Sequence, residues 1–431
     1  MPRHYLLVTI GSHGDVHPFA GLGAALMRRG HRATLVTNGH FEPMARKLGL
    51  DFVEVGTSEE YLRLARNPEL WTIKGGFKVV FSSVANLLPR VYDAIVPRID
   101  SETTVVGSSL ALSARVAQEH MGFPMATVHL SPSIFRSSIA PPKLPGLWMP
   151  DWLPLWVKRS MWAMGDKLVI DPVIAPTLNE FRAGFGLPPV SRILNEWWHA
   201  PDCVIGMFPE WFAPKQADWP KQTVLTGFPL FDERGHEVLP AELEKFLDDR
   251  PDEPPIAFTP GSAMFFGHEF FDAAVAACRA IGRRGVLLTR HAEQIPTSLP
   301  KEVIHVPYAP FSELLPRAAA LVHHGGIGTT SQGLFAGVPQ LIMTLSHDQF
   351  DNALRVKRLG CGDAILPGAF RGPAVAAKLK HLLEDASVAQ SCRDVAGRFV
   401  GVDALVQTCQ VLESLGERTT RFQPVACASA D

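Results

Sequence analysis

The stretch LVHHGGIGTTSQGLFAGVPQ, residues 321–340, decides the fold of this chain. An apolar strand ends in two histidines, passes through glycines and enters a helix with Thr329 and Thr330 at its start. Glycines let the backbone approach a ligand, and the free N–H groups and dipole of a helix N-terminus attract an anion. The stretch therefore predicts a strand–turn–helix unit of an α/β sheet with a phosphate site, to which His324 adds an imidazole donor.

Units of the same kind repeat along the chain. In the second half they are IAFTPGS, a helix near 268–283, GVLLTR, VIHVPYAPFSELL and GVPQLIMTL, followed by a helix from about Asp351. In the first half they are YLLVTI, a helix that Pro18 starts, RATLVT, TTVVGSS, the helix ALSARVAQEHMG and PMATVHL. Apolar strands that alternate with helices are typical of parallel sheets covered on both faces. We expect an α/β protein with two Rossmann-like, doubly wound domains that face each other across a cleft.

The boundary between the two domains lies in a polar, Pro-rich stretch near 233–254. A chain of 431 residues exceeds one hydrophobic core, which also favours two domains. We expect an N-terminal domain over 1–235, a C-terminal domain over 236–400, and a helix with a weakly structured tail over 401–431.

Residues 132–200 interrupt the alternation with many Pro, Trp and Met residues. One interpretation is an irregular insertion whose helices pack on the domain. A second is the wall of a pocket for an apolar molecule, because aromatic and Met side chains make adaptable apolar linings. A third is contact with a membrane surface, although Asp151, Lys158 and Asp166 interrupt any long apolar face.

The bulk composition excludes several classes of function. With 46% hydrophobic and 19% charged residues the chain is globular, and a net charge of -2 gives no basic surface for nucleic acid or anionic lipid. The six scattered cysteines indicate a reducing compartment. The N-terminal apolar run is too short for a signal peptide, and no stretch of about 18 uncharged apolar residues spans a membrane. We expect a cytoplasmic protein.

Three other kinds of site are less consistent with the sequence. His323, His324, His347 and Asp348 are metal-ligand types, but they lack an H-x-x-x-H spacing, so we expect no metal. A P-loop requires Gly-Lys-Ser/Thr, which is missing. A nicotinamide site requires G-x-G-x-x-G and an acidic residue after the second strand, where this chain has GSHGDV and Thr37.

The segment HHGGIGTTSQGLFAGVPQLIMTLSHDQFDNALRV resembles the donor signature of family 1 glycosyltransferases with the GT-B fold. That signature runs H-x-G-x-x-(S/T), then G-V-P, then D-Q-x-x-N-A. The segment GSHGDVHPF…RRGH resembles the N-terminal acceptor loop of the same family. Within the family, LWTIKGGFKVV, FPEWFAPKQADWP and TGFPLFD look like the rhamnosyltransferases of bacterial rhamnolipid synthesis.

The resemblance implies roles for individual residues toward a nucleotide-sugar co-substrate. His324 would bind the diphosphate, Gly328 with Thr329 would complete its cradle, and Asp348 with Gln349 would hold the sugar hydroxyls. An aromatic ring at Tyr308 would stack on the base, and Ser262 would lie near the phosphates. Plant members have a ribose-binding Glu where this chain has Gln332, which weakens the expectation of a uridine ribose. The donor-binding residues that we predict are Ser262, Tyr308, His324, Gly326, Gly328, Thr329, Thr330, Gln332, Asp348 and Gln349. No metal cofactor is expected, because donors and the helix dipole can neutralise the diphosphate.

A transfer with inversion needs a base for the proton of the acceptor hydroxyl. Plant members use His in G-H-x-x-P, a position that Asp15 takes here in G-D-V-H-P. The Asp that orients the plant His is also missing, because Ser108 and Ser109 stand in that region. Asp15 is therefore the predicted base, with His13 and His17 as rivals, and a plain helix cap as the remaining interpretation of Asp15.

The predicted activity is transfer of a hexosyl or deoxyhexosyl group to a hydroxyl of an apolar acceptor. The wider family favours UDP-glucose as donor, and the rhamnolipid-type resemblance favours dTDP-rhamnose. Residues 60–90 and 132–200 should line the acceptor pocket, and their composition fits a hydroxy-fatty acid, phenol, polyketide or sterol. Two alternatives are a nucleotide-sugar epimerase of the same fold and a non-catalytic partner that binds sugar nucleotide or lipid.

Overall fold

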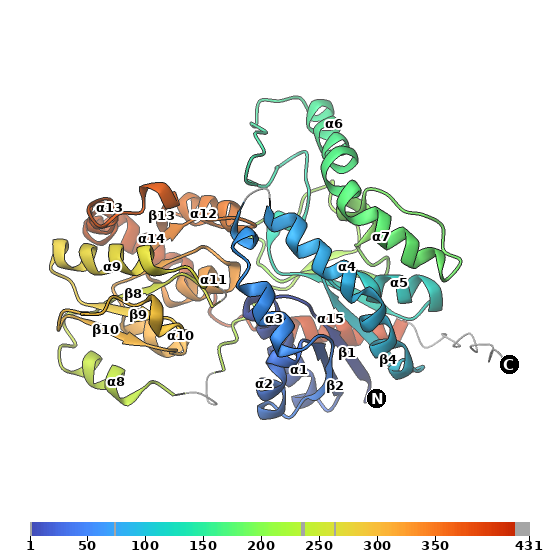
Figure 1. Ribbon diagram of the computed structural model, residues 1–431, viewed down its shortest axis with the longest axis horizontal. Helices are drawn as coiled ribbons and strands as arrows, with labels where there is room; N and C mark the ends of the chain where they lie inside the picture. Colours follow the sequence, from blue (N-terminus) through green and yellow to red (C-terminus); the bar gives the residue numbers. More distant parts are fainter. Residues whose placement is uncertain (1, 73–74, 234–237, 263, 419–431) are drawn as a thin grey trace.

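The computed structural model describes residues 2–72, 75–233, 238–262 and 264–418, and two α/β units make up this part of the chain (Figure 1). Each unit is built on one sheet, and every strand pair in both sheets is parallel. The predicted α/β class with two doubly wound domains is confirmed.

The N-terminal sheet has the order β3-β2-β1-β4-β5-β6-β7. Its strands are β1 (His4–Val8), β2 (Arg32–Thr37), β3 (Asp51–Glu54), β4 (Thr103–Ser108), β5 (Met125–His129), β6 (Cys203–Gly206) and β7 (Thr223–Leu225). Its helices are α1 (His13–Arg28), α2 (Glu42–Lys47), α3 (Ser58–Ala65), α4 (Gly75–Ile95), α5 (Leu112–Met121), α6 (Leu155–Gly165) and α7 (Asp171–Ala183). Every residue of β1 and β4 is buried, as their continuous apolar sequences predict.

The C-terminal sheet has the order β10-β9-β8-β11-β12-β13. Its strands are β8 (Ile256–Thr259), β9 (Gly285–Leu288), β10 (Val303–Val306), β11 (Ala320–His323), β12 (Gln340–Met343) and β13 (Gly362–Ile365). The remaining helices are α8 (Ala241–Asp248), α9 (His268–Ile281), α10 (Phe311–Leu314), α11 (Ile327–Ala336), α12 (Gln349–Arg358), α13 (Gly372–Glu384), α14 (Ala386–Gly397) and α15 (Ala404–Arg418).

The strand order reverses at one place in each sheet, between β1 and β4 and between β8 and β11. Ligands of open α/β sheets bind beyond the carboxyl ends of the strands at such a switch point. In the N-terminal sheet this point joins the loop that carries Asp15 to Ser108 and Ser109 at the end of β4. In the C-terminal sheet it joins the loop that carries Ser262 to His324. The topology therefore places the predicted residues of each half side by side.

The start of α1 differs from the prediction. The helix begins at His13, five residues before Pro18, and Ser12 is its N-cap. Asp15 is thus the third residue of the helix, not its cap. Pro18 is the sixth residue of α1, beyond the first turn, so its missing N–H removes one hydrogen bond from the helix.

The last helix, α15, returns to the N-terminal domain, which the sequence did not predict. Glu413 accepts hydrogen bonds from Arg29 at 2.7 Å and pairs with His31 at 2.9 Å. The hydroxyl of Thr408 lies 2.8 Å from that of Thr226. The chain therefore crosses between the domains twice. The expected boundary at 235/236 and the expected tail beyond residue 418 lie outside the described residues.

By length and composition alone, one described helix, Gly75–Arg98, could span a membrane, and we expected none. This run contains α4. Its side chains Phe81 and Val84 are buried in a cluster with Ile174 and Leu178 of α7. The helix thus contributes to the core of the N-terminal domain.

Candidate active site

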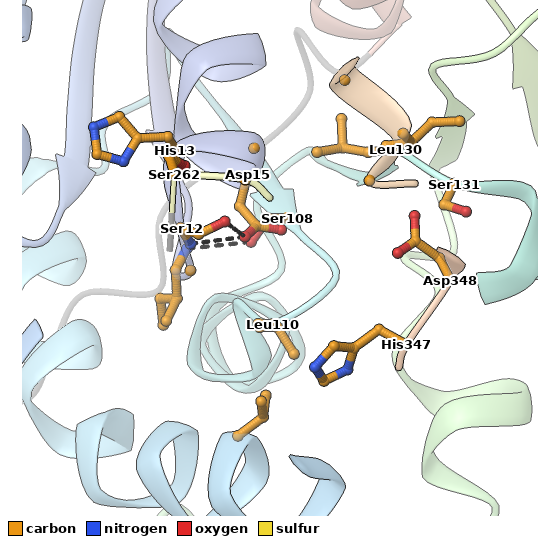
Figure 2. Close-up of a pocket in the computed structure, with 18 of the residues that line it drawn as sticks. Ser12, His13, Asp15, Ser108, Leu110, Leu130, Ser131, Ser262, His347 and Asp348 are labelled. Atoms are coloured by element: carbon orange, nitrogen blue, oxygen red, sulfur yellow. Dashed lines mark hydrogen bonds between the residues drawn. The ribbon is translucent and has the colours of Figure 1, made fainter. Parts of the chain in front are cut away.

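A cavity of about 1150 Å³ lies between the two domains. Single small-ligand sites are commonly about 300–1,000 Å³, so this cavity has room for two substrates. Figure 2 shows Asp15 and Ser108 on one side of it and Asp348 with His347 on the other. Predicted site residues that line it are Asp15, His13, His17, Ser262, Tyr308, His324, Gly326, Gly328, Thr329, Gln332, Asp348 and Gln349.

Asp15 uses one carboxylate oxygen to hold its own loop. Its Oδ2 accepts hydrogen bonds from the backbone N–H of Ser12 at 2.7 Å and from the Ser12 hydroxyl at 3.1 Å. Gly11 makes room for it: its φ is +140°, and a Cβ there would lie 2.2 Å from Oδ2. Neither bond uses Oδ1, so the side chain supports the helix start and keeps one oxygen for chemistry.

The surroundings of Asp15 favour a base that works near neutral pH. Burial raises the pKa of its carboxyl to about 6, against the lowering effect of the Ser12 hydrogen bonds, and the charge of Asp348 across the cavity raises it further. A group with a pKa close to the working pH combines the correct ionisation with useful basicity.

The two rival bases, His13 and His17, have lowered pKa values. Burial, with Arg290 nearby, lowers the pKa of His13 to about 3 and that of His17 to about 4. The His13 ring packs 4.9 Å from that of Phe41, and His17 Nε2 lies 3.4 Å from the Glu233 carboxylate. Imidazoles with such low pKa values are weaker bases than Asp15.

His324 stands at the entrance of α11, where glycines fit around it. A Cβ at Gly261 would lie 2.7 Å from its Cε1, and one at Gly326 would lie 2.5 Å from its Nε2. Its Nδ1 is buried and has no hydrogen-bond partner among the described residues. Burial lowers the pKa of His324 to about 4, so the ring is a neutral donor beside the N-terminus of α11.

The neighbouring His323 is structural. Its Nδ1 accepts the backbone N–H of Gly325 at 3.1 Å, so its Nε2 carries the proton and donates to Gln340 Oε1 at 2.9 Å. This pair fixes the turn in which Gly325 has a φ of +92°. Of the two adjacent histidines, His323 therefore stabilises the turn and His324 lines the cavity.

The two adjacent threonines at the start of α11, Thr329 and Thr330, also have different surroundings. Thr329 lines the cavity with Gly328. Thr330 is fully buried, does not line the cavity, and donates its hydroxyl to Gly326 O at 3.0 Å. Its predicted contact with the donor is therefore corrected to a contact within α11, because the Thr330 side chain is buried and its hydroxyl is used by the first turn of the helix.

Asp348 and Gln349 lie at the start of α12, in the connection that follows β12. Asp348 Oδ2 accepts a hydrogen bond from Asn352 Nδ2 at 2.7 Å, and burial raises the pKa of the carboxyl. Gln349 Oε1 accepts the N–H groups of Leu345 at 2.6 Å and Ser346 at 3.0 Å. Toward a sugar, Gln349 therefore offers its amide N–H groups, while Asp348 offers acceptor oxygens.

Tyr308 and Gln332 line the part of the cavity next to His324. The Tyr308 hydroxyl donates to Asp232 O at 2.7 Å. The guanidinium of Arg290 lies 5.3 Å from the centre of the Tyr308 ring and 3.5 Å from His13 Nε2. Arg290 is a cation in the cavity that the sequence analysis missed, although its position directly after β9 is the kind of position where ligand-binding residues occur.

His347 connects the domains, and the sequence analysis gave it only as a metal alternative. It has a φ of +57°, and its Nε2 lies 3.1 Å from Leu70 O, to which it donates. A non-glycine residue in the left-handed region is strained by about 1 kcal/mol or more, a feature that clusters at functional sites.

In the part of the chain that the structure describes, no three His, Cys, Asp or Glu side chains group to hold a metal ion.

A second part of the cavity lining is rich in apolar side chains, although Arg63, Arg90 and Arg136 also line it. Residues from both predicted ranges line it, 60–90 and 132–200, which confirms that the insertion forms a pocket wall. The apolar lining includes Phe77, Phe81, Val84, Leu87, Leu110, Leu130, Ile134, Leu144, Val169, Ile170, Leu194 and Trp198. Trp148, Trp152 and Trp156 are exposed instead and do not line it.

Known proteins resemble this chain in both domains. Residues 5–139 match the model of the glycosyltransferase family 28 N-terminal domain, and residues 284–406 match that of the erythromycin biosynthesis protein CIII-like, C-terminal domain. The chain is 29% identical to O-mycaminosyltylonolide 6-deoxyallosyltransferase of Streptomyces fradiae, over 97% of this chain and 99% of that protein. It is 30% identical to glycosyltransferase GtfC of Amycolatopsis orientalis, over 84% of this chain and 85% of that one.

A third relative is longer. The chain is 26% identical to the sterol 3-beta-glucosyltransferase of Leptosphaeria maculans over 84% of its own length, and it spans about 25% of that protein. Among solved structures, the glycotransferase of kitacinnamycin superposes with a TM-score of 0.72 at 22% identity, over 96% of this chain and 99% of the other. The calicheamicin glycosyltransferase CalG4 gives 0.71 at 20% identity, over 97% and 99%. These similarities confirm the predicted GT-B fold.

Proposed function

The chain belongs to the family 1 glycosyltransferases of the GT-B fold, and we propose that it transfers a hexosyl or deoxyhexosyl group with inversion to a hydroxyl of an apolar small molecule. One observation carries this proposal. Asp15, with a pKa of about 6 and an Oδ1 that its loop does not use, lines the same cavity as the N-terminus of α11 and many apolar side chains.

The reaction follows from this arrangement. Asp15 takes the proton of the acceptor hydroxyl while that oxygen forms a bond to the anomeric carbon. The bond from this carbon to the diphosphate oxygen breaks on the opposite face, and the electron pair leaves with the diphosphate. Attack and departure on opposite faces invert the configuration of the anomeric carbon.

The leaving diphosphate would be held by His324, the Thr329 hydroxyl and the N–H groups at the start of α11. Helix N-termini and neutral hydrogen-bond donors stabilise such charge when they are already oriented. We propose on this basis that the transfer needs no metal ion.

The donor is a nucleoside diphosphate sugar, and we retain UDP-glucose and dTDP-rhamnose as the two types to test. The relative from S. fradiae is named for transfer of a 6-deoxyallosyl group, and solved structures of the same fold are described with dTDP or thymidine diphosphate. Both favour the dTDP and deoxysugar type, as does the resemblance to rhamnolipid rhamnosyltransferases. A neutral Gln332 in place of Glu at the cavity wall agrees with this preference.

The acceptor is apolar, because the wall opposite His324 is built from aliphatic and aromatic side chains. The named acceptors of the relatives, a tylonolide and sterols, are of this kind. We expect a polyketide, sterol, phenol or hydroxy-fatty acid.

We also propose that the protein contacts a membrane surface through the exposed aromatic side chains of the insertion. Trp148, Trp152 and Trp156 are 66%, 72% and 71% exposed. Val169, from the same insertion, is exposed and also lines the cavity. Exposed Trp side chains are typical of membrane interfaces. Replacing the three tryptophans with serine should abolish co-sedimentation with phosphatidylcholine vesicles, and binding that survives would contradict this contact.

The deciding experiment incubates the protein with UDP-glucose and dTDP-rhamnose, with and without a panel of the four acceptor types, and separates the products. Transfer requires the acceptor and gives an inverted glycoside. An epimerase would change the sugar without an acceptor, and a non-catalytic partner would give neither product.

The free, buried cysteines at 203, 278, 361, 392 and 409 agree with a proposed cytoplasmic location.

A further inference from the structure

A chain of buried hydrogen bonds ends at Ser109 on the cavity wall. Trp198 Nε1–H donates to His199 Nε2 at 3.2 Å, and His199 Nδ1 lies 3.0 Å from His129 Nε2. His129 Nδ1 in turn lies 2.8 Å from the Ser109 hydroxyl. His129 is fully buried and His199 nearly so, while Ser109 and Trp198 line the cavity.

The direction of every bond follows from Trp198. An indole can only donate, so His199 Nε2 accepts, and a neutral imidazole has one donor and one acceptor nitrogen. Burial lowers the pKa values of both His129 and His199, which keeps the rings neutral. His199 Nδ1–H therefore donates to His129 Nε2, and His129 Nδ1–H donates to Ser109 Oγ.

The opposite direction is excluded by the same residue. If Ser109 donated to His129, the His199 ring would carry its proton on Nε2, and that N–H would point at the N–H of Trp198. His129 thus does not activate Ser109 as a nucleophile. Ser109 accepts from His129, and no described residue accepts its own hydroxyl proton.

We propose that Ser109 is a specificity-determining residue that donates a hydrogen bond to an oxygen without a proton, such as a carbonyl, ether or carboxylate oxygen of the acceptor. This rests on the proposed function, because it assigns the occupant of the acceptor half. The position of Ser109 in the fold supports this proposal. Its neighbour Ser108 accepts the backbone N–H of Ile10 through Oγ at 3.4 Å, so Ser109 lies next to the segment that leads to Asp15. An acceptor atom held there sits beside the hydroxyl that Asp15 deprotonates.

The first test needs no turnover. Nitrogen NMR of the full-length protein labelled with ¹⁵N-histidine, assigned with His129→Gln and His199→Gln, reports which nitrogen of each ring carries the proton. We expect the Nδ1–H form of both rings, with no protonation around the ordinary histidine pKa. The Nε2–H form of either ring, or a protonated ring at neutral pH, would overturn the proposed direction.

The second test uses acetophenone and ethylbenzene as matched probes of the cavity, with and without a carbonyl oxygen. Ser109→Ala should weaken acetophenone binding about threefold to tenfold, as expected for one neutral hydrogen bond, and leave ethylbenzene within about twofold. Ser109→Thr keeps the hydroxyl and should restore acetophenone binding. Ser83→Ala is the control, since the Ser83 hydroxyl on the cavity wall donates to Val79 O.

Equal weakening of both probes, or of neither, would contradict a directed donor at Ser109. Neither measurement depends on glycosyl transfer. If no sugar is transferred but the tautomers and the carbonyl preference are as expected, the proposed function fails and the binding role of Ser109 stands.

Discussion

Replacement of Asp15 by asparagine separates the two roles that the structure gives this side chain. An asparagine Oδ1 can still accept the N–H of Ser12, so the start of α1 is retained. It cannot take a proton from a hydroxyl. Because general base catalysis contributes about 10²–10⁴-fold, kcat should fall by that factor while the Kd for the nucleotide sugar changes little.

The same substitution should stabilise the fold. The pKa of Asp15 rises from 3.8 in the unfolded chain to about 6 in the folded protein, so the folded state disfavours the charged carboxylate. At one pKa unit per 1.36 kcal/mol, ionised Asp15 destabilises the folded state by about 3 kcal/mol. This penalty is complete above the folded pKa of about 6 and disappears below about 4, where both states are protonated. The gain in Asp15→Asn should therefore be largest at neutral pH and absent in acid.

The assay combines urea unfolding from acid to neutral pH with initial rates at saturating substrates. The wild-type rate should fall below about pH 6, to about one tenth at pH 5. Asp385→Asn is the matched control: Asp385 caps α14 through Ser387 N–H at 2.8 Å, and that hydrogen bond lowers its pKa. It should lose stability and keep full turnover. Asp15→Asn would refute the reasoning if it behaved like Asp385→Asn.

Four further predictions concern the donor half. His324→Ala should raise the donor Kd about 10- to 100-fold, as for a hydrogen bond to a charged group, and calorimetric titration with dTDP and UDP measures it. Gly261→Ala should raise the donor Kd about as much as His324→Ala does, because the new Cβ would lie 2.7 Å from the His324 ring. An unchanged Kd would mean that His324 does not bind the diphosphate. Thr329→Ala should raise the donor Kd and leave the melting temperature unchanged, whereas Thr330→Ala should lower the melting temperature, with thermal unfolding in parallel as the readout. Because the pKa of His324 is about 4, the donor Kd should stay constant from about pH 6 to 8, and a tenfold change near the ordinary histidine pKa would contradict this. EDTA should leave the rate of transfer unchanged, and loss of activity in EDTA would contradict the proposal that no metal ion is needed.

Local sequence was sufficient for the parts of the site that one segment determines. The glycines that follow His324 predicted a close approach, and the structure shows that one of them, Gly326, leaves space for its ring, while Gly261 does so from the loop after β8. Asp15 was found because the loop of one strand–helix unit contains it. Its exact place in the helix was missed, since Pro18 suggested a later start than His13.

The missed features all depend on contacts between distant segments. Arg290 meets His13 from the other domain, and His347 reaches Leu70. The direction of the bonds to Ser109 depends on an indole that comes 89 residues later in the chain, counted from 109 to 198. No local pattern encodes such contacts, because they depend on the tertiary packing within and between the two domains.

Burial of the cleft acts on its acids and bases in opposite directions, and this links the donor half to the acceptor half. It raises the pKa values of Asp15 and Asp348 and lowers those of His13 and His324. Each group is thereby shifted toward its uncharged form. The diphosphate that enters meets neutral donors together with the cation Arg290, which also lines the cavity. The proton of the acceptor hydroxyl would stay in the site on Asp15 while the electron pair leaves with the diphosphate. The same desolvation that weakens the fold at Asp15 is what makes this carboxylate basic enough to act.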